Sequence, residues 1–179
     1  MKFSAVALAA ALAAAGAHAD TYTYNGDTTG SPTYQRALAG FGGLSGVGTA
    51  VRYDTLEFSV TQSGAYDFLS LAAGNWDNFL FLYSPSFEPG SPLVNGVASN
   101  DDFPTIGRSG FNGVNLSAGV NYVLVTTGFA NSSFGAYTNS ITGVGSVVVV
   151  PEPGTYGLMA LGLLGVGALV RRRRAQAAD

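Results

Sequence analysis

The sequence has 179 residues, of which 25 are glycine, 47% are hydrophobic, 11% are charged and none is cysteine. The lack of cysteine excludes a disulfide-bonded scaffold, and the high apolar content excludes a highly charged disordered chain. Residues 20–150 hold only three arginines against nine carboxylates. This acidic segment has no cluster of basic side chains that could neutralise phosphates, so we expect no nucleic-acid partner.

The first nineteen residues have the pattern of a secretory signal peptide. Lys2 supplies a positive charge, residues 3–15 are apolar and rich in alanine, and Ala17 and Ala19 are small residues at the positions that determine cleavage. We therefore expect signal peptidase to cut after Ala19. The cut removes Lys2 and His18, which are the only lysine and the only histidine of the sequence.

Between residues 20 and 150, short strand-like stretches alternate with turns rich in glycine, serine and asparagine. Residues 55–60 alternate in polarity, which predicts a half-buried strand. An extended pattern resumes at residues 65–71 after a turn-like stretch, so the two stretches are expected to form a hairpin. Residues 78–83 are apolar on both faces, which is typical of a central strand covered on both sides.

The remaining stretches complete the expected fold. Residues 40–48 hold five glycines, which predicts a mobile loop. Further strands are expected at residues 21–24, on a sheet edge, and at residues 120–126, 137–141 and 144–150. No helical period appears in this region. The predicted fold class is all-β, a sandwich or jelly roll, flanked by an N-terminal signal peptide and a C-terminal single transmembrane helix.

Oxygen-bearing side chains gather in two loops of the expected sandwich. Asp77 precedes the central strand, and Asp101 and Asp102 follow Asn100 later in the chain. Calcium prefers such hard oxygen ligands, so the three aspartates are the candidate ligands of a calcium ion. The alternative interpretation is that the Asn-Asp-Asp triplet forms a turn by capping its own backbone.

Trp76 is the candidate ligand-binding residue, because an indole ring at a loop tip can stack on a sugar. The alternative is that this single tryptophan belongs to the core.

The composition of the exported chain limits its chemistry. Without His, Cys or Lys it cannot form a Ser-His-Asp triad, a Cys-His pair, a Schiff base or a zinc site of His or Cys ligands. Carboxylate chemistry remains, since a glycosidase needs two acids across a cleft, and Asp77, Glu88, Asp101 and Asp102 are available. We expect a protein that is not an enzyme.

The segment 151–179 has three parts. Pro151, Glu152 and Pro153 interrupt a run of valines, residues 154–170 are almost wholly apolar, and Arg171, Arg172, Arg173 and Arg174 close the stretch. Such a stretch makes about 25 Å of helix, which only just crosses a membrane core. By the positive-inside rule the arginines stay cytoplasmic, and residues 20–150 lie outside the inner membrane.

These three parts, in this order behind a signal peptide, resemble the PEP-CTERM sorting tail of Gram-negative bacteria. The resemblance implies that an integral-membrane exosortase recognises Pro151, Glu152 and Pro153 and removes the tail. It further implies a precursor in the inner membrane and a mature form at the cell surface or outside the cell. The alternative is a plain single-pass anchor, in which the Pro-Glu-Pro triplet would have no role.

A second resemblance covers about residues 52–128. Its pieces are the alternation from Leu56 to Val60, the turn at Ser63 and Gly64, the strand from Asp77 to Tyr83, the triplet Asn100 to Asp102 and the stretch from Leu116 to Tyr122. Together they resemble bacterial pre-peptidase C-terminal-like β-sandwiches. The resemblance implies an accessory secreted module, in a group of which some members bind calcium or polymeric substrates.

The chain is thus divided into a signal peptide (1–19), an exported domain (20–150) and a sorting tail (151–179). The leading hypothesis is a non-catalytic protein that an exosortase sorts and processes, and that then binds polymer at the cell surface or in the exopolysaccharide matrix of a biofilm. The alternative is a carboxylate-dependent glycan hydrolase. A third hypothesis is an ice-binding body, which needs a regular threonine array, whereas Thr-x-Thr occurs only from Thr21 to Thr23.

Overall fold

The structure, a computed structural model, describes residues 19–74 and 76–150, and these residues fold as an all-β sandwich. Its strands are β1 (Asp20–Asp27), β2 (Thr33–Tyr34), β3 (Val51–Val60), β4 (Gly64–Ala72), β5 (Asn78–Tyr83), β6 (Gly96–Asn100), β7 (Arg108–Leu116), β8 (Tyr122–Gly128), β9 (Ala136–Gly143) and β10 (Val147–Val149), with one short 3-10 helix, η1 (Ala39–Phe41). The predicted all-β fold class is therefore confirmed.

Both ends of the precursor fall outside the described residues. They include the predicted signal peptide up to residue 18, the Pro-Glu-Pro motif, the apolar stretch and the arginine run. Within residues 19–74 and 76–150, no helix has the length and hydropathy needed to cross a membrane.

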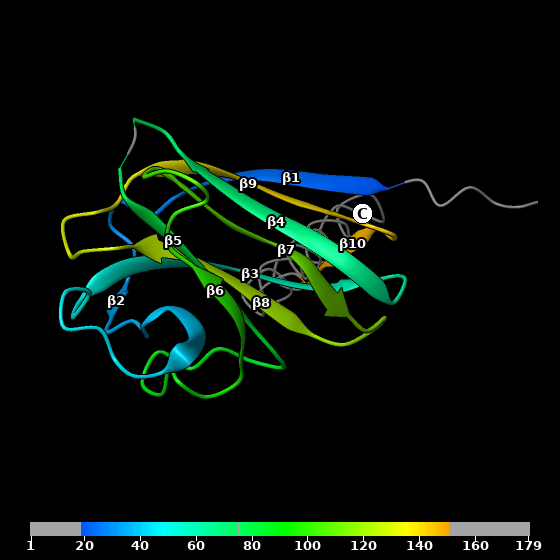
Figure 1. The fold of residues 1–179 in the computed structure, drawn as a ribbon, viewed down its shortest axis with the longest axis horizontal. Helices are drawn as coiled ribbons and strands as arrows, with labels where there is room; N and C mark the ends of the chain where they lie inside the picture. Colours follow the sequence, from blue (N-terminus) through cyan, green and yellow to red (C-terminus); the bar gives the residue numbers. More distant parts are fainter. Residues whose placement is uncertain (1–18, 75, 151–179) are drawn as a thin grey trace, which may run out of the picture.

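Two antiparallel sheets pack face to face (Figure 1). The four-stranded sheet has the order β1-β9-β4-β7, and the larger sheet has the order β10-β3-β8-β5-β6, with β2 paired to the start of β3. The expected edge strand near the N-terminus is confirmed, because β1 pairs only with β9. The main core lies between the sheets and includes Phe58, Phe68, Leu80 and Leu124.

The predicted hairpin of residues 55–71 is wrong. Strand β3 pairs with β8 and β10, whereas β4 pairs with β7 and β9, so the turn between them carries the chain from one sheet to the other. The apolar faces of the two strands meet across the sandwich, and the rings of Phe58 and Phe68 lie 6.2 Å apart. Two strands of alternating polarity can bury their apolar faces by packing against each other across the core. They can bury them equally well by pairing side by side in one sheet.

Strands β5 and β8 are buried along their whole length, which confirms the prediction of a central strand covered on both sides. On one face, Leu80 and Leu82 join the core between the sheets. On the other face, Phe79 and Phe81 stack with ring centroids 4.5 Å apart and belong to a second cluster. A covering segment must therefore lie on the outer side of the larger sheet.

Residues 35–48 supply part of this cover, and residues 40–48, where a mobile loop is predicted, contain part of η1 and backbone hydrogen bonds. The segment folds back on itself, because the backbone N–H of Arg36 donates to the carbonyl of Gly48 (3.0 Å) and that of Ser45 donates to the carbonyl of Arg36 (2.8 Å). Its helix η1 lies beside β6 (Figure 1), where Phe41 packs on Phe81.

Arg36 anchors the cover with a side chain that is only 2% exposed. Its guanidinium lies 4.4 Å from the ring centroid of Phe79 and 4.9 Å from that of Phe129. Its Nε and Nη2 atoms donate to the carbonyl of Phe129, and Nη1 donates to the carbonyl of Ala37. Gly48 permits this packing, since a Cβ there would lie 2.6 Å from the Arg36 side chain.

A row of polar side chains crosses the inner face of the smaller sheet. Tyr24, Asn139, Ser70 and Ser109 occupy paired positions on β1, β9, β4 and β7. Asn139 donates through Nδ2 to the Tyr24 hydroxyl (2.8 Å), and the Nδ2 of Asn78, on the opposite sheet, donates to the Ser70 hydroxyl (2.9 Å). One end of the sandwich core is thus polar, and sequence patterns did not indicate it.

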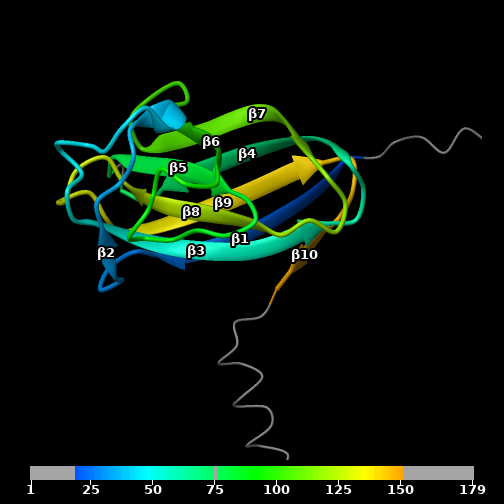
Figure 2. The ribbon, with the colours of Figure 1, turned by 90° about the horizontal axis from the view of Figure 1, so that it is seen from below.

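The chain leaves the sandwich at the edge of the larger sheet (Figure 2). Strand β10 pairs with the end of β3, with Val149 opposite Phe58, and the N–H of Val150 donates to the carbonyl of Glu57 (2.9 Å). Both buried clusters consist of residues between 37 and 141, so the segment 20–150 contains a complete core of its own.

Candidate metal centre

Strand pairing explains why two loops distant in sequence meet. Strands β5 and β6 are antiparallel neighbours, with Leu80 opposite Asn100. Asp77 comes just before β5, and Asp101 and Asp102 come just after β6. The start of one antiparallel strand lies beside the end of its partner. The three aspartates therefore lie at the same end of the β5–β6 pair.

The three carboxylates form a compact cluster. One oxygen from each of Asp77, Asp101 and Asp102 lies within 4.8 Å of the other two. Asp77 and Asp101 are partly buried, and Asp102 is exposed. An ion could therefore enter from solvent past Asp102.

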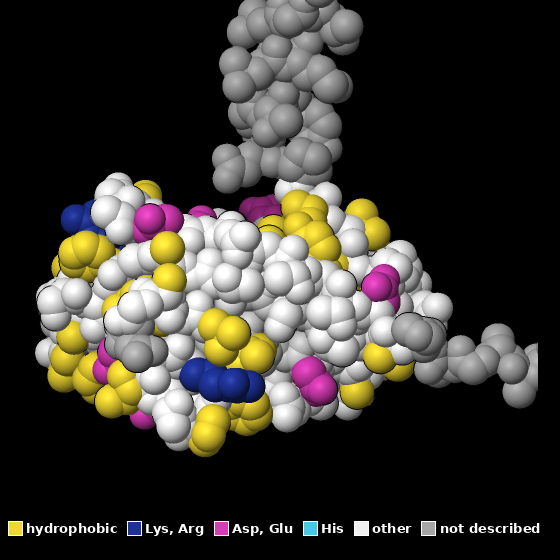
Figure 3. All heavy atoms as spheres, turned by 90° about the horizontal axis from the view of Figure 1, so that it is seen from above, with side chains coloured by type: hydrophobic (Ala, Val, Ile, Leu, Met, Phe, Trp, Pro, Cys, Tyr) yellow, Lys and Arg dark blue, Asp and Glu magenta, His cyan; other side chains and the backbone are white. Residues whose placement is uncertain are grey.

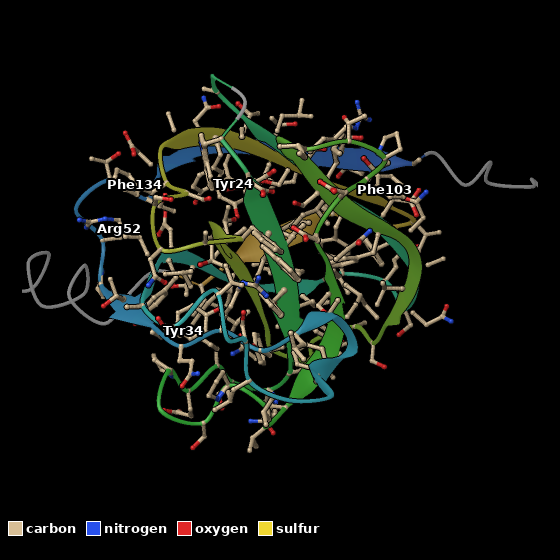
Figure 4. All side chains as sticks on the ribbon, turned by 60° about the vertical axis from the view of Figure 1, so that its left-hand side comes forward. Tyr24, Tyr34, Arg52, Phe103 and Phe134 are labelled. Carbon is tan, nitrogen blue, oxygen red and sulfur yellow. The ribbon has the colours of Figure 1, made fainter. Side chains whose placement is uncertain are left out.

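Backbone and amide hydrogen bonds hold the loops in place. The carbonyl of Asp77 accepts from the N–H of Phe129 (2.9 Å). The Oδ1 of Asn100 accepts from the N–H of Asp101 (2.9 Å), and its Nδ2 donates to the carbonyl of Gly110 (2.7 Å). Next in the chain, Phe103 (labelled in Figure 4) donates its N–H to the carbonyl of Arg108. Asn100 thus ties β6 to β7.

The turn interpretation of the Asn-Asp-Asp triplet applies to its first residue alone. Asn100 caps the backbone N–H of Asp101 as that interpretation predicts. The Asp101 Oδ1 atom, in contrast, is buried and has no hydrogen-bond partner among the described residues. A buried oxygen without a partner is costly, so a turn does not account for Asp101.

Electrostatics set Asp101 apart from an ordinary surface carboxylate. Burial raises its pKa to about 6, and the neighbouring Asp77 and Asp102 add to the rise, while Arg36 opposes it. The pKa of Asp77 is raised for the same reasons, with burial first and Asp102 second. Keeping all three carboxylates ionised therefore costs free energy. A bound cation would remove this cost.

The donor set suits a calcium ion better than a transition metal. Calcium takes about 6–8 oxygen ligands at about 2.3–2.6 Å, and carboxylates bind it through one or both oxygens. Asp77, Asp101 and Asp102 supply up to six such oxygens, and carbonyls or water supply the rest. Imidazole and thiolate ligands, which zinc and copper prefer, are missing from residues 20–150 of the sequence.

Trp76 lies next to this cluster in the chain and is neither a core residue nor a free platform. Its side chain is partly exposed, and its Nε1 donates to the carbonyl of Ala136 (2.9 Å). The ring packs against Gly135, where a Cβ would lie 2.9 Å from the indole. The remaining exposed part of the ring could still contact a ligand.

The other acids lie apart from the cluster. Glu88 is in the loop that follows β5, so the length of β5 separates it from Asp77, and the two do not form a pair. Glu57 and Asp67 are exposed strand residues. The sequence offered no sign that Arg36, which is distant in the chain from both Asp77 and Asp101, influences them, because only the cover brings it near them.

Two solved structures resemble the fold at low similarity. One is the periplasmic lysozyme inhibitor PliG of Aeromonas hydrophila, an inhibitor of g-type lysozyme, with a TM-score of 0.36 and 14% identity over 75% of this chain and 90% of that chain. The other is the K3 cleaved adhesin domain of Lys-gingipain from Porphyromonas gingivalis, with a TM-score of 0.32 and 16% identity over 67% and 90%. No curated protein sequence matches the chain.

The C-terminal segment has a specific match. Residues 149–174 match the family model described as the PEP-CTERM protein-sorting motif, which confirms the resemblance found in the sequence. The match begins in β10 and covers the Pro-Glu-Pro triplet, the apolar stretch and the arginines. No family match supports the pre-peptidase-like resemblance of the body, which stays a prediction. The chain therefore carries a PEP-CTERM sorting motif, which marks it as an exported protein sorted by an exosortase.

Proposed function

We propose that the exported domain is a non-catalytic binding module of the cell surface or the exopolysaccharide matrix, and that calcium in its acidic loops supports the binding of polymer. The observation that carries this proposal is the cluster of Asp77, Asp101 and Asp102, whose oxygens lie within 4.8 Å of one another. A calcium ion held there can also coordinate hydroxyl or carboxylate oxygens of a polysaccharide.

Sorting and composition support the same conclusion. A sorting motif marks the chain for export, which is consistent with a binding role outside the cell. Residues 20–150 lack His, Cys and Lys, which removes most hydrolytic and covalent mechanisms. Figure 3 shows one face on which charged side chains are few and scattered, as suits contact with a hydrated polymer.

Co-sedimentation with the producing organism's own exopolysaccharide tests the proposal. We expect the 20–150 fragment to pellet with the polymer in calcium and to stay in the supernatant when calcium is chelated. Asp101→Asn should weaken the calcium-dependent binding at least tenfold, because it removes a central charge. Asp20→Asn is the matched control, since Asp20 is exposed on β1 of the other sheet.

Two outcomes would count against this function. Equal pelleting with and without calcium would mean that the domain binds polymer but that calcium has no part in the binding. No pelleting in either condition would remove the polymer as a partner and point to proteins of the cell surface instead.

A glycan hydrolase remains the second candidate, and one observation favours it. A carboxyl group with a pKa raised to about 6, close to a second carboxylate, has the properties of a general acid paired with a nucleophile. If this is correct, the fragment should release reducing ends from the polysaccharide, and Asp101→Asn should abolish the release. Binding without any release of reducing ends would contradict the enzyme hypothesis.

The ice-binding hypothesis gains a surface that the sequence did not indicate. Thr21, Thr23 and Asn25 on β1 lie opposite Thr142, Ser140 and Thr138 on β9, and the hydroxyls of Thr21 and Thr142 lie 3.0 Å apart. The array has two rows of three small polar side chains. Thermal hysteresis no greater than that of a control protein would dismiss this hypothesis.

A further inference from the structure

A second candidate site lies on the outer face of the larger sheet, away from the acidic loops. It is a groove of about 240 Å³ between β3 and the loop that follows β5. Its main lining residues are Tyr53, Thr55 and Glu57 from β3, Phe87 and Glu88 from the loop, and Val123 from β8. Val123 lies opposite both Glu57 and Tyr83 in the sheet, so the sheet itself forms the floor.

Hydrogen bonds hold the loop beside the sheet and preform the groove. The Ser84 hydroxyl donates to the carbonyl of Asn121 (2.8 Å), and the Asn121 Nδ2 donates back to the carbonyl of Pro85 (2.8 Å). The Tyr83 hydroxyl donates to the carbonyl of Pro92 (3.0 Å). A ligand would therefore meet a shaped surface and would not have to order the loop.

Aromatic rings make one wall of the groove. The rings of Tyr53 and Phe87 lie 5.4 Å apart and meet nearly edge to face, at 76°. Tyr34 and Tyr83 support them from beneath, with Phe87 lying 5.2 Å from Tyr34 and 4.8 Å from Tyr83. The supported rings of Tyr53 and Phe87 stay partly exposed, so each offers area to a ligand.

The charge of the groove is negative and uncompensated. Glu57 and Glu88 are both exposed on its lining. Residues 20–150 contain only three arginines, and none serves this groove. Arg36 donates to Phe129 and Ala37, Arg52 lies over the ring of Phe134 (Figure 4), and Arg108 lies on β7 of the other sheet.

We propose that this groove binds a protonated amino sugar, that is, a hexosamine unit whose amine carries no acetyl group. The two carboxylates attract the ammonium group, and the aromatic wall favours both a cation and the apolar face of a sugar ring. The size agrees, because a cavity of about 150 Å³ accommodates benzene and a substituted six-membered ring needs somewhat more. The groove lies at the opposite end of β5 from Asp77 and acts without calcium.

Titration calorimetry of the 20–150 fragment in a chelating buffer tests the proposal. The probes are a glucosamine hexamer, an N-acetylglucosamine hexamer and spermidine. We expect the glucosamine hexamer to bind at least tenfold more tightly than either of the other two. The double substitution Glu57→Gln and Glu88→Gln should weaken its binding at least tenfold, and Asp20→Asn should leave it unchanged.

A second variant distinguishes a loss of binding at the groove from a loss of binding that misfolding causes. Thr55→Lys places a cation in the groove at an exposed strand position, so it should abolish binding while the melting temperature stays within a few degrees of the wild type. Equal affinity for the two hexamers would overturn the role of charge. Equal affinity for spermidine would overturn recognition of a sugar, and an absence of heat with every probe would overturn the site.

Discussion

At the scale of single residues, Asp101 shows how one side chain takes its properties from its surroundings. In sequence it is one of two adjacent aspartates in a polar loop. In the structure its Oδ1 is buried without a hydrogen-bond partner, and two further carboxylates lie beside it. The sequence predicted Asp101 as a candidate metal ligand, because oxygen-bearing side chains cluster around it in the chain. The sequence did not predict the burial that raises its pKa.

Asp101 should make the chelated domain less stable as the pH rises. Its pKa goes from the model-compound value of 3.8 to about 6 on folding, so between these values the folded state binds more protons than the unfolded chain. The free energy of unfolding therefore falls as the pH rises through this interval. Thermal melts in a chelator should show this fall, and Asp101→Asn should reduce it.

Calcium provides the control for this prediction. Because a bound cation stabilises the ionised carboxylates, calcium should raise the melting temperature at pH 7 in the wild type much more than in Asp101→Asn. A wild-type stability that falls no more steeply from pH 4 to pH 6 than that of the variant would contradict the raised pKa.

At the scale of elements, the differences between prediction and structure have separate causes. Alternation located β3 and β4 correctly, yet it does not say whether two successive strands pair or face each other across a core. Strands β6 and β7 were missed, since Gly, Ser and Asn interrupt their apolar pattern. The glycine-rich segment at residues 40–48 has a packing role that its composition did not indicate, because a cover held by Arg36 needs the close backbone approach that Gly48 permits.

Arg36 should contribute more to stability than any exposed arginine. Arg36→Met removes its donors to Phe129 and Ala37, leaves carbonyls without partners and uncovers the faces of Phe79 and Phe129. We expect the free energy of unfolding to fall by about 2–4 kcal/mol. Urea denaturation measures this change.

Arg52→Met is the matched substitution. Arg52 contacts the Ser31 carbonyl at 3.3 Å and the Phe134 ring, in a partly exposed position (Figure 4). Arg52→Met should lower the free energy of unfolding by no more than about 1 kcal/mol. Similar losses for the two variants would show that the cover does not depend on Arg36.

At the scale of the whole molecule, the sandwich ends where the sorting segment begins. The last described backbone hydrogen bond joins Val150 to Glu57 on the edge strand β3, and the Pro-Glu-Pro triplet follows at once. Three residues span at most about 11 Å, so a precursor anchored from residue 154 would keep this sheet edge close to the membrane. In such a precursor, we expect the exosortase to act in a narrow gap between the domain and the bilayer.

Glu152→Ala should block processing in the producing cell. Residues 149–174 match the sorting motif, and we expect the triplet to be the part that the sorting enzyme recognises. We expect an uncleaved precursor in the inner-membrane fraction, detected by immunoblot against the domain, and a loss of the extracellular form. Ser146→Ala, five residues upstream of the triplet, is the control, and normal release of Glu152→Ala would contradict this role of the motif.

The sequence alone was sufficient for those features that depend on local order. The sorting motif, the all-β class and the buried central strand all follow from residues that are adjacent or alternate along the chain. The sequence also predicted Asp77, Asp101 and Asp102 as candidate ligands, because a concentration of acids in loops can be recognised without knowledge of the fold.

Tertiary structure alone decided which distant segments meet. The pairing of β5 with β6 brings Asp77 to Asp101, and the packing of the loop after β5 on β3 makes the groove of Glu57 and Glu88. The polar row from Tyr24 to Ser109 arises from the register of four strands. Such contacts depend on strand order and register, which are set by the summed packing of the whole core and not by any one stretch of residues.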